Sequence, residues 1–145
     1  MMSEVHTPVF ERVEVWDSAT IDAFRTLNLE YFTWMADELS RHCALRFEEI
    51  TGLNMESYVE RTVELSCSVV PLKATLMLLR TRTGDLVGMG GLRRLPDGAA
   101  EIVRIFMRPS FRGHRFGTAM VERLITEAEL SGYEIIRLDT AVFME

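Results

Sequence analysis

The sequence has 145 residues, of which 48% are hydrophobic and 26% charged, a balance typical of folded globular proteins that argues against disordered and fibrous classes. Its net charge of −6 argues against a general nucleic-acid-binding protein, for which a basic domain is expected. No apolar run approaches the ~18 residues that span a bilayer, and the start of the chain has no signal-peptide core. We therefore expect one soluble, cytoplasmic domain over residues 1–145, with neither a membrane nor a nucleic acid as partner.

The charge is unevenly distributed along the chain. Residues 1–72 contain 13 acidic and 5 basic side chains, whereas residues 73–145 contain 9 acidic and 11 basic ones. Four arginines fall in a short stretch of the second half that contains no acidic residue: Arg104, Arg108, Arg112 and Arg115. This cluster favours a small anionic ligand rather than a polymer, and a solvated basic loop is an equally good explanation.

Cysteine and histidine usage gives no indication of a metal site. Cys43 and Cys67 are too few for a disulfide framework and lack the spacing of metal ligands, so we expect two buried free thiols. His6 and His42 also have no partners at metal-ligand spacing. We predict that the protein binds no metal.

The first half of the chain predicts one strand and two helices. Segment 9–16 alternates loosely and favours a strand. Asp17 or Ser18 can cap a helix that runs to about residue 40, and Asn54 can cap a second helix that ends near residue 66. Apolar side chains recur along the first helix at three- and four-residue steps, and we interpret them as core rather than as a cofactor site: Phe24, Leu27, Tyr31, Trp34 and Met35. The second helix has its expected buried side at Tyr58, Val59, Thr62 and Val63.

After Pro71 the pattern changes to strands. Segments 73–81, 86–95 and 99–108 are separated by two turn sequences and predict an antiparallel meander. Pro109 should end the third strand because it lacks the N–H that a ladder requires. A helix over 117–131, closed by Gly132 in a left-handed conformation, and a strand over 133–142 follow. This strand–helix–strand order predicts parallel neighbours and therefore a mixed α/β fold.

The loop between strand 99–108 and helix 117–131 is the most informative segment. A helix N-terminus presents unpaired N–H groups and a positive dipole end, which suit phosphate oxygens. Gly113 and Gly117 allow a ligand to approach the main chain, and Arg112 and Arg115 can add charge-assisted contacts. We expect a phosphate-binding loop at 109–118, and a tight loop without a ligand is the alternative.

Two other nucleotide motifs do not fit the sequence. Gly113 and Gly117 are too close together for a nucleotide P-loop, and Thr118 follows without a lysine. The run Gly88-Met89-Gly90-Gly91 resembles part of a dinucleotide fingerprint, but it lies inside a predicted hairpin strand and no helix follows it.

The stretch AEIVRIFMRPSFRGHRFGTAMVERLITEAELSGYEIIRLDT, residues 100–140, resembles the acetyl-CoA-binding core of the GNAT N-acetyltransferase superfamily. The family signature is Arg or Gln, two variable residues, Gly, one variable residue, and then Gly or Ala. Arg112 and Gly117 match its first and last positions, whereas Arg115 replaces the middle glycine. The order of predicted elements between residues 9 and 145 also resembles the fold of that family.

The resemblance implies an N-acetyltransferase that uses acetyl-CoA as cosubstrate and moves the acetyl group to a primary amine of a small molecule or a protein, by direct attack of the amine on the thioester. It implies that main-chain groups of Ile105, Phe106 and Met107 bind the pantetheine arm. It also implies that a run of backbone groups binds the pyrophosphate, namely those of Arg112, Gly113, His114, Arg115, Phe116, Gly117 and Thr118. His114 is interpreted as a phosphate neighbour or a solvent-facing spacer.

By the same resemblance, Glu101 is the candidate general base, because an ammonium cannot attack the thioester until it loses a proton. The alternative is that Glu101 pairs with Arg93 or Arg94 across the hairpin. A non-catalytic CoA-binding or sensing module, or a structural remnant of the fold, are the alternative functions.

Members of the family normally continue after the strand that corresponds to 133–142 with another helix and two more strands, and that helix often supplies a tyrosine general acid. Here only Phe143-Met144-Glu145 follow. We therefore expect a truncated version of the fold with no assignable general acid. We also expect strand 133–142 to be an exposed edge that pairs with a second copy in a homodimer.

Overall fold

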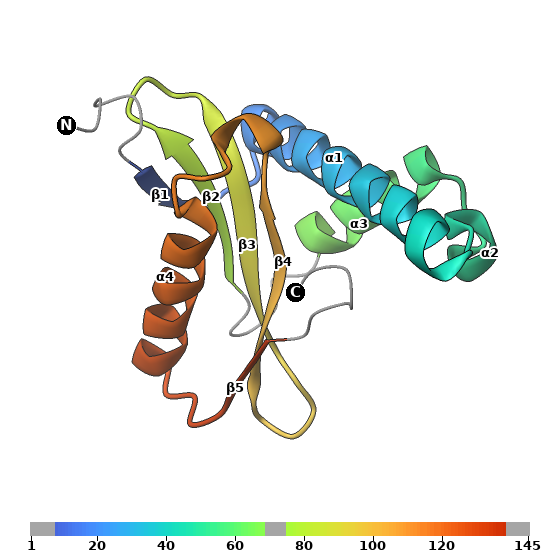
Figure 1. Ribbon diagram of the computed structural model, residues 1–145. Coiled ribbons are helices and arrows are strands. Elements are labelled where there is room, and N and C mark those ends of the chain that lie inside the picture. Colours follow the sequence, from blue (N-terminus) through green and yellow to red (C-terminus); the bar gives the residue numbers. More distant parts are fainter. Residues whose placement is uncertain (1–7, 69–74, 139–145) are drawn as a thin grey trace. The chain divides into compact units, whose positions relative to one another are not determined.

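The computed structural model describes residues 8–68 and 75–138, without the side chains of 65–68. These residues form two compact units (Figure 1). One unit contains β1 (Pro8–Arg12), β2 (Thr75–Thr81), β3 (Leu86–Arg94), β4 (Ala100–Met107), a 3₁₀ turn (Pro109–Phe111), α4 (Phe116–Leu130) and β5 (Ile136–Leu138). The other contains α1 (Ser18–Cys43), α2 (Phe47–Thr51) and α3 (Met55–Ser68).

The five strands form one sheet in the order β1-β2-β3-β4-β5. Neighbours are antiparallel from β1 to β4, and β5 is parallel to β4. The structure therefore confirms the predicted meander, the parallel pair and the mixed α/β class.

Both terminal strands are shorter than the sequence predicted. The expected strand 9–16 ends at Arg12, although Val13 N still donates to Leu76 O at 2.9 Å. The expected strand 133–142 begins only at Ile136, because Tyr133 N donates to Ala128 O at 3.1 Å and so still belongs to the end of α4. Residues 139–142 of that prediction lie outside the described residues.

Helix α4 packs its predicted apolar face on the sheet. Met120, Leu124 and Ala128 are fully buried and belong to one core cluster with Leu92 and Ile102. Figure 1 shows α4 running alongside the sheet. The spacing of four residues thus predicted the buried face correctly.

The glycine run in β3 makes room for this packing. A Cβ at Gly88 would lie 2.3 Å from the main-chain oxygen of Phe106, and a Cβ at Gly90 would lie 2.6 Å from Met120 Cγ. The segment that resembled a dinucleotide motif is therefore a packing feature.

Strand β4 contains a bulge that the sequence did not predict. Gly91 pairs with Val103 and Met89 pairs with Phe106, so Gly90 faces two residues, Arg104 and Ile105. Arg104 has a positive φ of 55°. Such a bulge bends the strand and leaves one residue outside the regular ladder.

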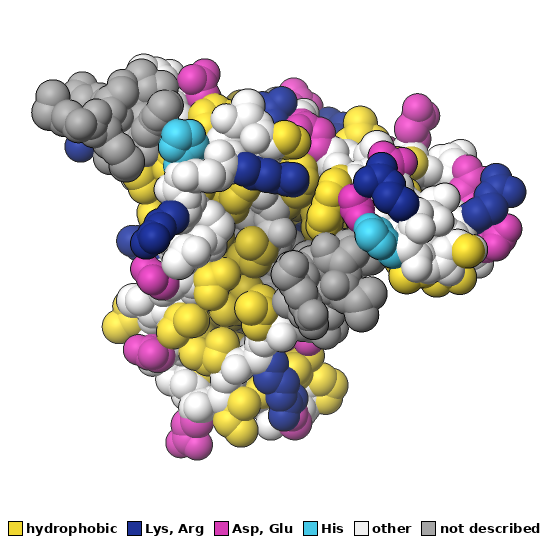
Figure 2. All heavy atoms as spheres, in the orientation of Figure 1, with side chains coloured by type: hydrophobic (Ala, Val, Ile, Leu, Met, Phe, Trp, Pro, Cys, Tyr) yellow, Lys and Arg dark blue, Asp and Glu magenta, His cyan; other side chains and the backbone are white. Residues whose placement is uncertain are grey.

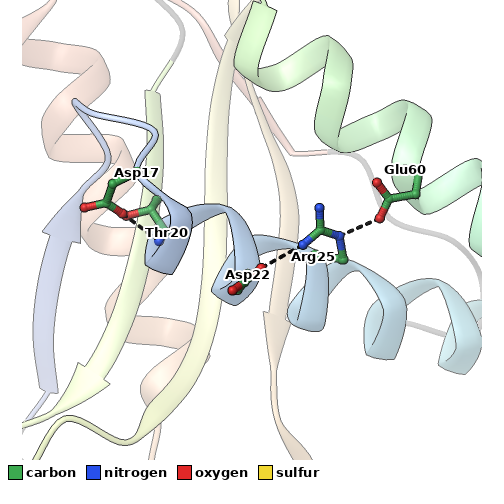
Figure 3. A network of polar contacts seen from close by, with 5 residues as sticks. All are labelled: Asp17, Thr20, Asp22, Arg25 and Glu60. Carbon is green, nitrogen blue, oxygen red and sulfur yellow. Dashed lines mark hydrogen bonds and ion pairs between the residues drawn. The ribbon is translucent and has the colours of Figure 1, made fainter.

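The first helix of the helical unit, α1, begins where the sequence predicted. Asp17 caps α1 by accepting a hydrogen bond from Thr20 N at 2.8 Å, and this bond lowers the pKa of the Asp17 carboxyl (Figure 3). Arg25 on α1 joins Asp22 on the same helix to Glu60 on α3 (Figure 3).

The apolar stripe of α1 is core over its first half. Phe24, Leu27 and Tyr31 are buried, whereas Trp34 and Met35 are half-buried. On α3, Val59, Thr62 and Val63 are buried and Tyr58 is half-buried, as expected. Asn54 Oδ1 accepts from Ser57 N at 2.9 Å, which confirms the predicted cap.

Two features of the helical unit differ from expectation. The short helix α2 was not predicted, and its Phe47 ring forms a T-shaped contact with the Tyr58 ring, with the centroids 5.0 Å apart. Cys43 is exposed, so the prediction of a buried thiol is wrong for this residue. It is the last residue of α1, which ends at left-handed Ala44. The side chain of Cys67 lies outside the described residues.

Among the described residues, no helix combines the length and the hydropathy that a membrane span requires.

Candidate functional site

The end of β4 leads directly into the loop that the sequence singled out. Arg108 N still donates to Val87 O of β3 at 2.8 Å, and Pro109 then ends the strand as predicted. The 3₁₀ turn Pro109–Phe111 reverses the chain, with Phe111 N donating to Arg108 O at 2.9 Å. The loop therefore begins at a rigid point of the sheet.

Arg112 folds back over the end of β4. Its Nε donates to Met107 O at 3.1 Å, and its guanidinium carbon lies 5.8 Å from the centroid of the Phe106 ring. The side chain thus connects the loop to the two last residues of the strand.

The loop turns into α4 through two left-handed residues. Gly113 has a φ of +89° and Arg115 a φ of 61°. Arg115 stands where the expected signature has its middle glycine, so a non-glycine residue adopts a conformation that costs about 1–2 kcal/mol for an L-residue. The position explains why a glycine would be favoured there.

The N-terminus of α4 presents main-chain donors at its open end. Its first helical hydrogen bond runs from Ala119 N to Arg115 O at 3.0 Å. The N–H groups of Phe116, Gly117 and Thr118 precede that bond and have no acceptor within the helix. They carry the partial positive charge of the helix dipole, which suits an anion.

Gly117 leaves this end of the helix open. A Cβ built there would have Met107 Cγ as its nearest neighbour, at 3.9 Å, which is ordinary contact distance. Neither the packing nor the backbone conformation therefore requires a glycine at 117. Its effect is to leave the main chain uncovered.

The last residues of β4 lie next to this helix end. Among the described residues, β5 pairs with β4 over Ala100–Ile102, and Val103–Met107 continue β4 beyond that pairing (Figure 1). Phe106 and Met107 have buried side chains, and Ile105 is half-buried. Figure 2 shows hydrophobic side chains gathered between β4 and α4. Half-buried apolar residues that pack on the core here include Ile105, Val121, Ile125 and Ile136.

The loop before α4 carries further basic and aromatic side chains. Arg115 and His114 are exposed, and the His114 ring lies 5.6 Å from the buried Phe116 ring. Arg108 Nη1 lies 3.5 Å from Leu86 O. The structure thus places positive charge at this loop, as the sequence indicated. The Arg112 guanidinium also forms the hydrogen bond to Met107 O that holds the loop against β4.

Glu101 lies at the start of β4, away from the loop. Its Oε1 accepts from Arg93 Nε at 2.8 Å and lies 2.6 Å from Arg93 Nη2, and the two residues are direct register partners. This confirms the pairing that the sequence offered as the alternative for Glu101, with Arg93 rather than Arg94 as partner. The catalytic role of Glu101 stays a prediction.

The described residues contain no group of three or more His, Cys, Asp or Glu side chains that could hold a metal ion.

The pairing of Arg93 with Glu101 could have been found from the sequence by counting across the turn Pro96-Asp97-Gly98, which places Arg93 opposite Glu101.

Comparison with known proteins identifies the family of this chain. The model of the acetyltransferase (GNAT) family matches residues 21–144. The chain belongs to this family.

Individual relatives agree with this assignment. Over 67 residues, the chain is 33% identical to an IAA acetyltransferase from Azospirillum brasilense, a match that spans 46% of this chain and only 44% of that relative. The fold is similar to that of a ribosomal-protein-alanine N-acetyltransferase from Brucella melitensis biovar Abortus 2308, with a TM-score of 0.60, 17% identity, and coverage of 94% of this chain and 82% of that one. It is equally similar to a predicted acetyltransferase from Clostridium acetobutylicum solved with acetyl-CoA, with a TM-score of 0.60, 12% identity, and coverage of 94% and 83%.

Proposed function

We propose that this protein is an acetyl-CoA-dependent N-acetyltransferase that acetylates a primary amine. The observation that carries the proposal is that two main-chain segments lie next to each other. One is the main chain of β4 at Ile105–Met107, beyond the described pairing with β5, and the other is the N-terminus of α4. An extended amide-containing arm that ends in a diphosphate fits this pair of surfaces.

In this proposal the pantetheine arm adds to β4 as an extra strand, since its amides can pair with main-chain groups of Ile105–Met107. The pyrophosphate binds the N–H groups from Arg112 to Thr118 at the helix end, with the Arg115 guanidinium adding charge. Family membership and the acetyl-CoA bound in the Clostridium acetobutylicum relative support this ligand.

The chemistry proposed is direct transfer. Glu101 accepts a proton from the protonated amine, through water because it lies about 12 Å along the strand from Ile105. The neutral nitrogen attacks the thioester carbonyl carbon, the carbon–sulfur bond breaks, and the CoA thiolate leaves with the electron pair. The nitrogen loses its second proton to that thiolate, which gives the amide and free CoA. Main-chain N–H groups at the β4 bulge stabilise the oxyanion that forms in between.

The test is transfer to a panel of acceptors followed by mass spectrometry. Primary amines, among them amino acids, polyamines and peptide N-termini, should gain an acetyl group from acetyl-CoA, and alcohols of the same size should not. Glu101→Gln should lower kcat/KM by roughly 10²–10⁴. Transfer to alcohols alone would contradict the proposed acceptor class.

A binding module without catalysis is the second candidate, and the Arg93–Glu101 ion pair is the observation that favours it. If the pair is purely structural, the chain retains a cofactor site and lacks a base. Saturable acetyl-CoA binding without transfer to any acceptor would select this candidate.

We also propose that the chain forms a homodimer through β5. Ile135 and Leu138 are 55% and 53% exposed at this edge. A second copy pairing there would cover them. A single monomeric species by light scattering at micromolar concentration would refute the dimer.

A further inference from the structure

Arg104 holds a backbone conformation that is unusual inside a β-strand. Three non-glycine residues among those described have a positive φ, and two of them, Ala44 and Arg115, lie at helix ends. Arg104, with a φ of 55°, lies instead at the bulge of β4. This left-handed conformation costs free energy for an L-residue, whereas glycine adopts it readily. Residues strained in this way gather at functional sites, which directs attention to what the Arg104 side chain binds.

The face of the sheet that carries α4 is filled at the bulge. A Cβ at Gly90, opposite the bulge, would lie 2.6 Å from Met120 Cγ and 2.9 Å from Ile105 Cδ1. Arg104 is half-buried, and an arginine side chain typically buries its stem and keeps its charged group towards water. A ligand that approaches the bulge can therefore contact the guanidinium without entering the core.

The chain around Arg104 contributes positive charge. Residues 102–121 contain no Asp or Glu, and residues 86–92 of the neighbouring strand β3 contain no charged side chain. Glu101, at the start of β4, is engaged with Arg93, whose Nη2 lies 2.6 Å from Oε1. Positive charge at the bulge favours an anionic ligand. A guanidinium is suited to a carboxylate in particular, because it can donate two parallel hydrogen bonds to it.

We propose that Arg104 determines acceptor specificity by binding the carboxylate of an amine substrate of the α-amino-acid class, an inference that rests on the proposed acetyl transfer. In that reaction the thioester carbonyl meets the main chain at the β4 bulge, so the amine nitrogen has to come close to Arg104. A carboxylate on the carbon next to that nitrogen then lies within reach of the guanidinium. One guanidinium balances the single charge of a carboxylate, whereas a phosphate ester carries nearly two. Arg104 takes up no proton in this role.

The experiment compares α-amino acids with their amides, in which a neutral group of the same shape replaces the carboxylate. The wild type should prefer the amino acids. Arg104→Met should lower the ratio of kcat/KM for amino acid over amide by roughly 10- to 100-fold, the range expected for hydrogen bonds to a charged group, through a higher KM for the amino acid. Wild type and variant use the same acceptors at one pH, so differences in amine ionisation cancel.

Two further variants show that the effect belongs to the Arg104 charge. Arg104→Lys should keep part of the ratio, because the charge remains and the paired donors do not. Arg94→Met is the matched control, since Arg94 is an exposed residue of the neighbouring strand β3, and it should keep the ratio of the wild type.

A second readout does not depend on turnover. An N-acetylated amino acid should raise the Tm of the CoA-bound wild type more than the corresponding N-acetylated amide does. This difference should vanish in Arg104→Gly. Glycine adopts a φ of 55° readily, so Arg104→Gly keeps the test available if Arg104→Met does not fold.

The outcomes separate the role of Arg104 from the reaction itself. Equal losses of kcat/KM for amino acid and amide in the folded variants would overturn the role of Arg104 and leave the acetyl transfer intact. A preference for phosphorylated amines that is lost in Arg104→Met would overturn the carboxylate as the ligand. A wild-type chain that binds acetyl-CoA but acetylates no amine would instead refute the proposed function, and the role of Arg104 with it.

Discussion

Arg112 Nε donates a hydrogen bond to the main-chain oxygen of Met107, five residues earlier in the chain, at 3.1 Å. The bond joins the loop before α4 to the last residue of β4. It therefore connects the two surfaces proposed to bind one cofactor, the strand edge and the helix end. The site depends on their spacing, which this side chain helps to hold.

The family signature accepts Arg or Gln at this position, and the bond gives a physical reason. A glutamine amide can also donate to Met107 O, whereas a methionine of similar length cannot. Arg112→Met should therefore lose about 1 kcal/mol of folding free energy and bind acetyl-CoA more weakly. Arg112→Gln should retain the stability. Urea unfolding and calorimetric titration of both variants make the comparison, and equal behaviour of the two would show that the bond does not hold the site.

Gly117→Ala separates cofactor binding from folding. The nearest atom to the new Cβ would be 3.9 Å away, so the variant should be as stable as the wild type or up to about 1 kcal/mol more stable. The same methyl group covers the helix end, so the dissociation constant of acetyl-CoA should rise about tenfold, equal to about 1.4 kcal/mol of binding free energy. Gly113→Ala is the contrast, because its φ of +89° predicts a loss of stability. Unchanged affinity in Gly117→Ala would place the cofactor elsewhere.

Arg115→Gly removes the backbone strain and the positive charge at this position together. The glycine adopts the left-handed conformation without strain but loses more chain entropy on folding, so stability should stay within about 1 kcal/mol of the wild type. Acetyl-CoA affinity should fall, and its dependence on salt should weaken, because an exposed charge at the proposed phosphate site is lost. Arg115→Lys should retain the salt dependence. Titrations at two ionic strengths measure both effects, and an unchanged salt dependence in Arg115→Gly would show that Arg115 does not contact the phosphates.

Alanine at the glycine positions of β3 should lower the stability of the protein to different extents. Gly88→Ala places a Cβ 2.3 Å from a main-chain oxygen, which can move only with the strand, whereas Gly90→Ala meets the side chain of Met120. Both should destabilise the protein, Gly90→Ala by about 1–3 kcal/mol and Gly88→Ala by more. Met120→Ala should partly rescue Gly90→Ala and have no such effect on Gly88→Ala. Thermal unfolding of the single and double variants tests this, and additive losses at Gly90 and Met120 would contradict the packing described.

Asp97 predicts a pH-dependent contribution to stability. The hydrogen bond from Ala99 N, and secondly the contact with Arg137, lower the pKa of its carboxyl below 3.8. The stabilisation is therefore present above about pH 4 and is lost as the pH falls through the lowered value. Asp97→Ala should be less stable than the wild type at pH 7, with the difference shrinking towards pH 3. Arg137→Ala should remove only part of the effect, and a difference that is constant with pH would disprove the assignment.

Local patterns predicted most of the fold. Asp17 and Asn54 cap the helices they were expected to cap, and Met120, Leu124 and Ala128 are buried as their spacing indicated. Gly132, with a φ of +87°, ends α4 in the predicted left-handed conformation. These features depend on residues within one turn or one strand of each other, which is the range over which sequence patterns are informative.

Features that depend on contacts across strands were not predicted. The bulge at Arg104 lies opposite Gly90, where β3, β4 and α4 come together through Gly90, Ile105 and Met120. The exposure of Cys43 follows from where α1 ends. The pairing of Glu101 with Arg93 was one of two alternatives, and the choice between Arg93 and Arg94 depended on the exact register of a hairpin.

The measurement that tests the central claim most directly is a thermal-shift titration of the full chain with acetyl-CoA, with adenosine diphosphate as the pyrophosphate control. A ligand that binds only the folded state at ~100 times its dissociation constant adds about 2.7 kcal/mol of stability. We predict a saturable rise in Tm with acetyl-CoA, a smaller one with adenosine diphosphate, and a weakened response in Gly117→Ala. A folded wild-type protein whose Tm does not change with either ligand would contradict the cofactor site and leave the chain as a structural remnant of the fold.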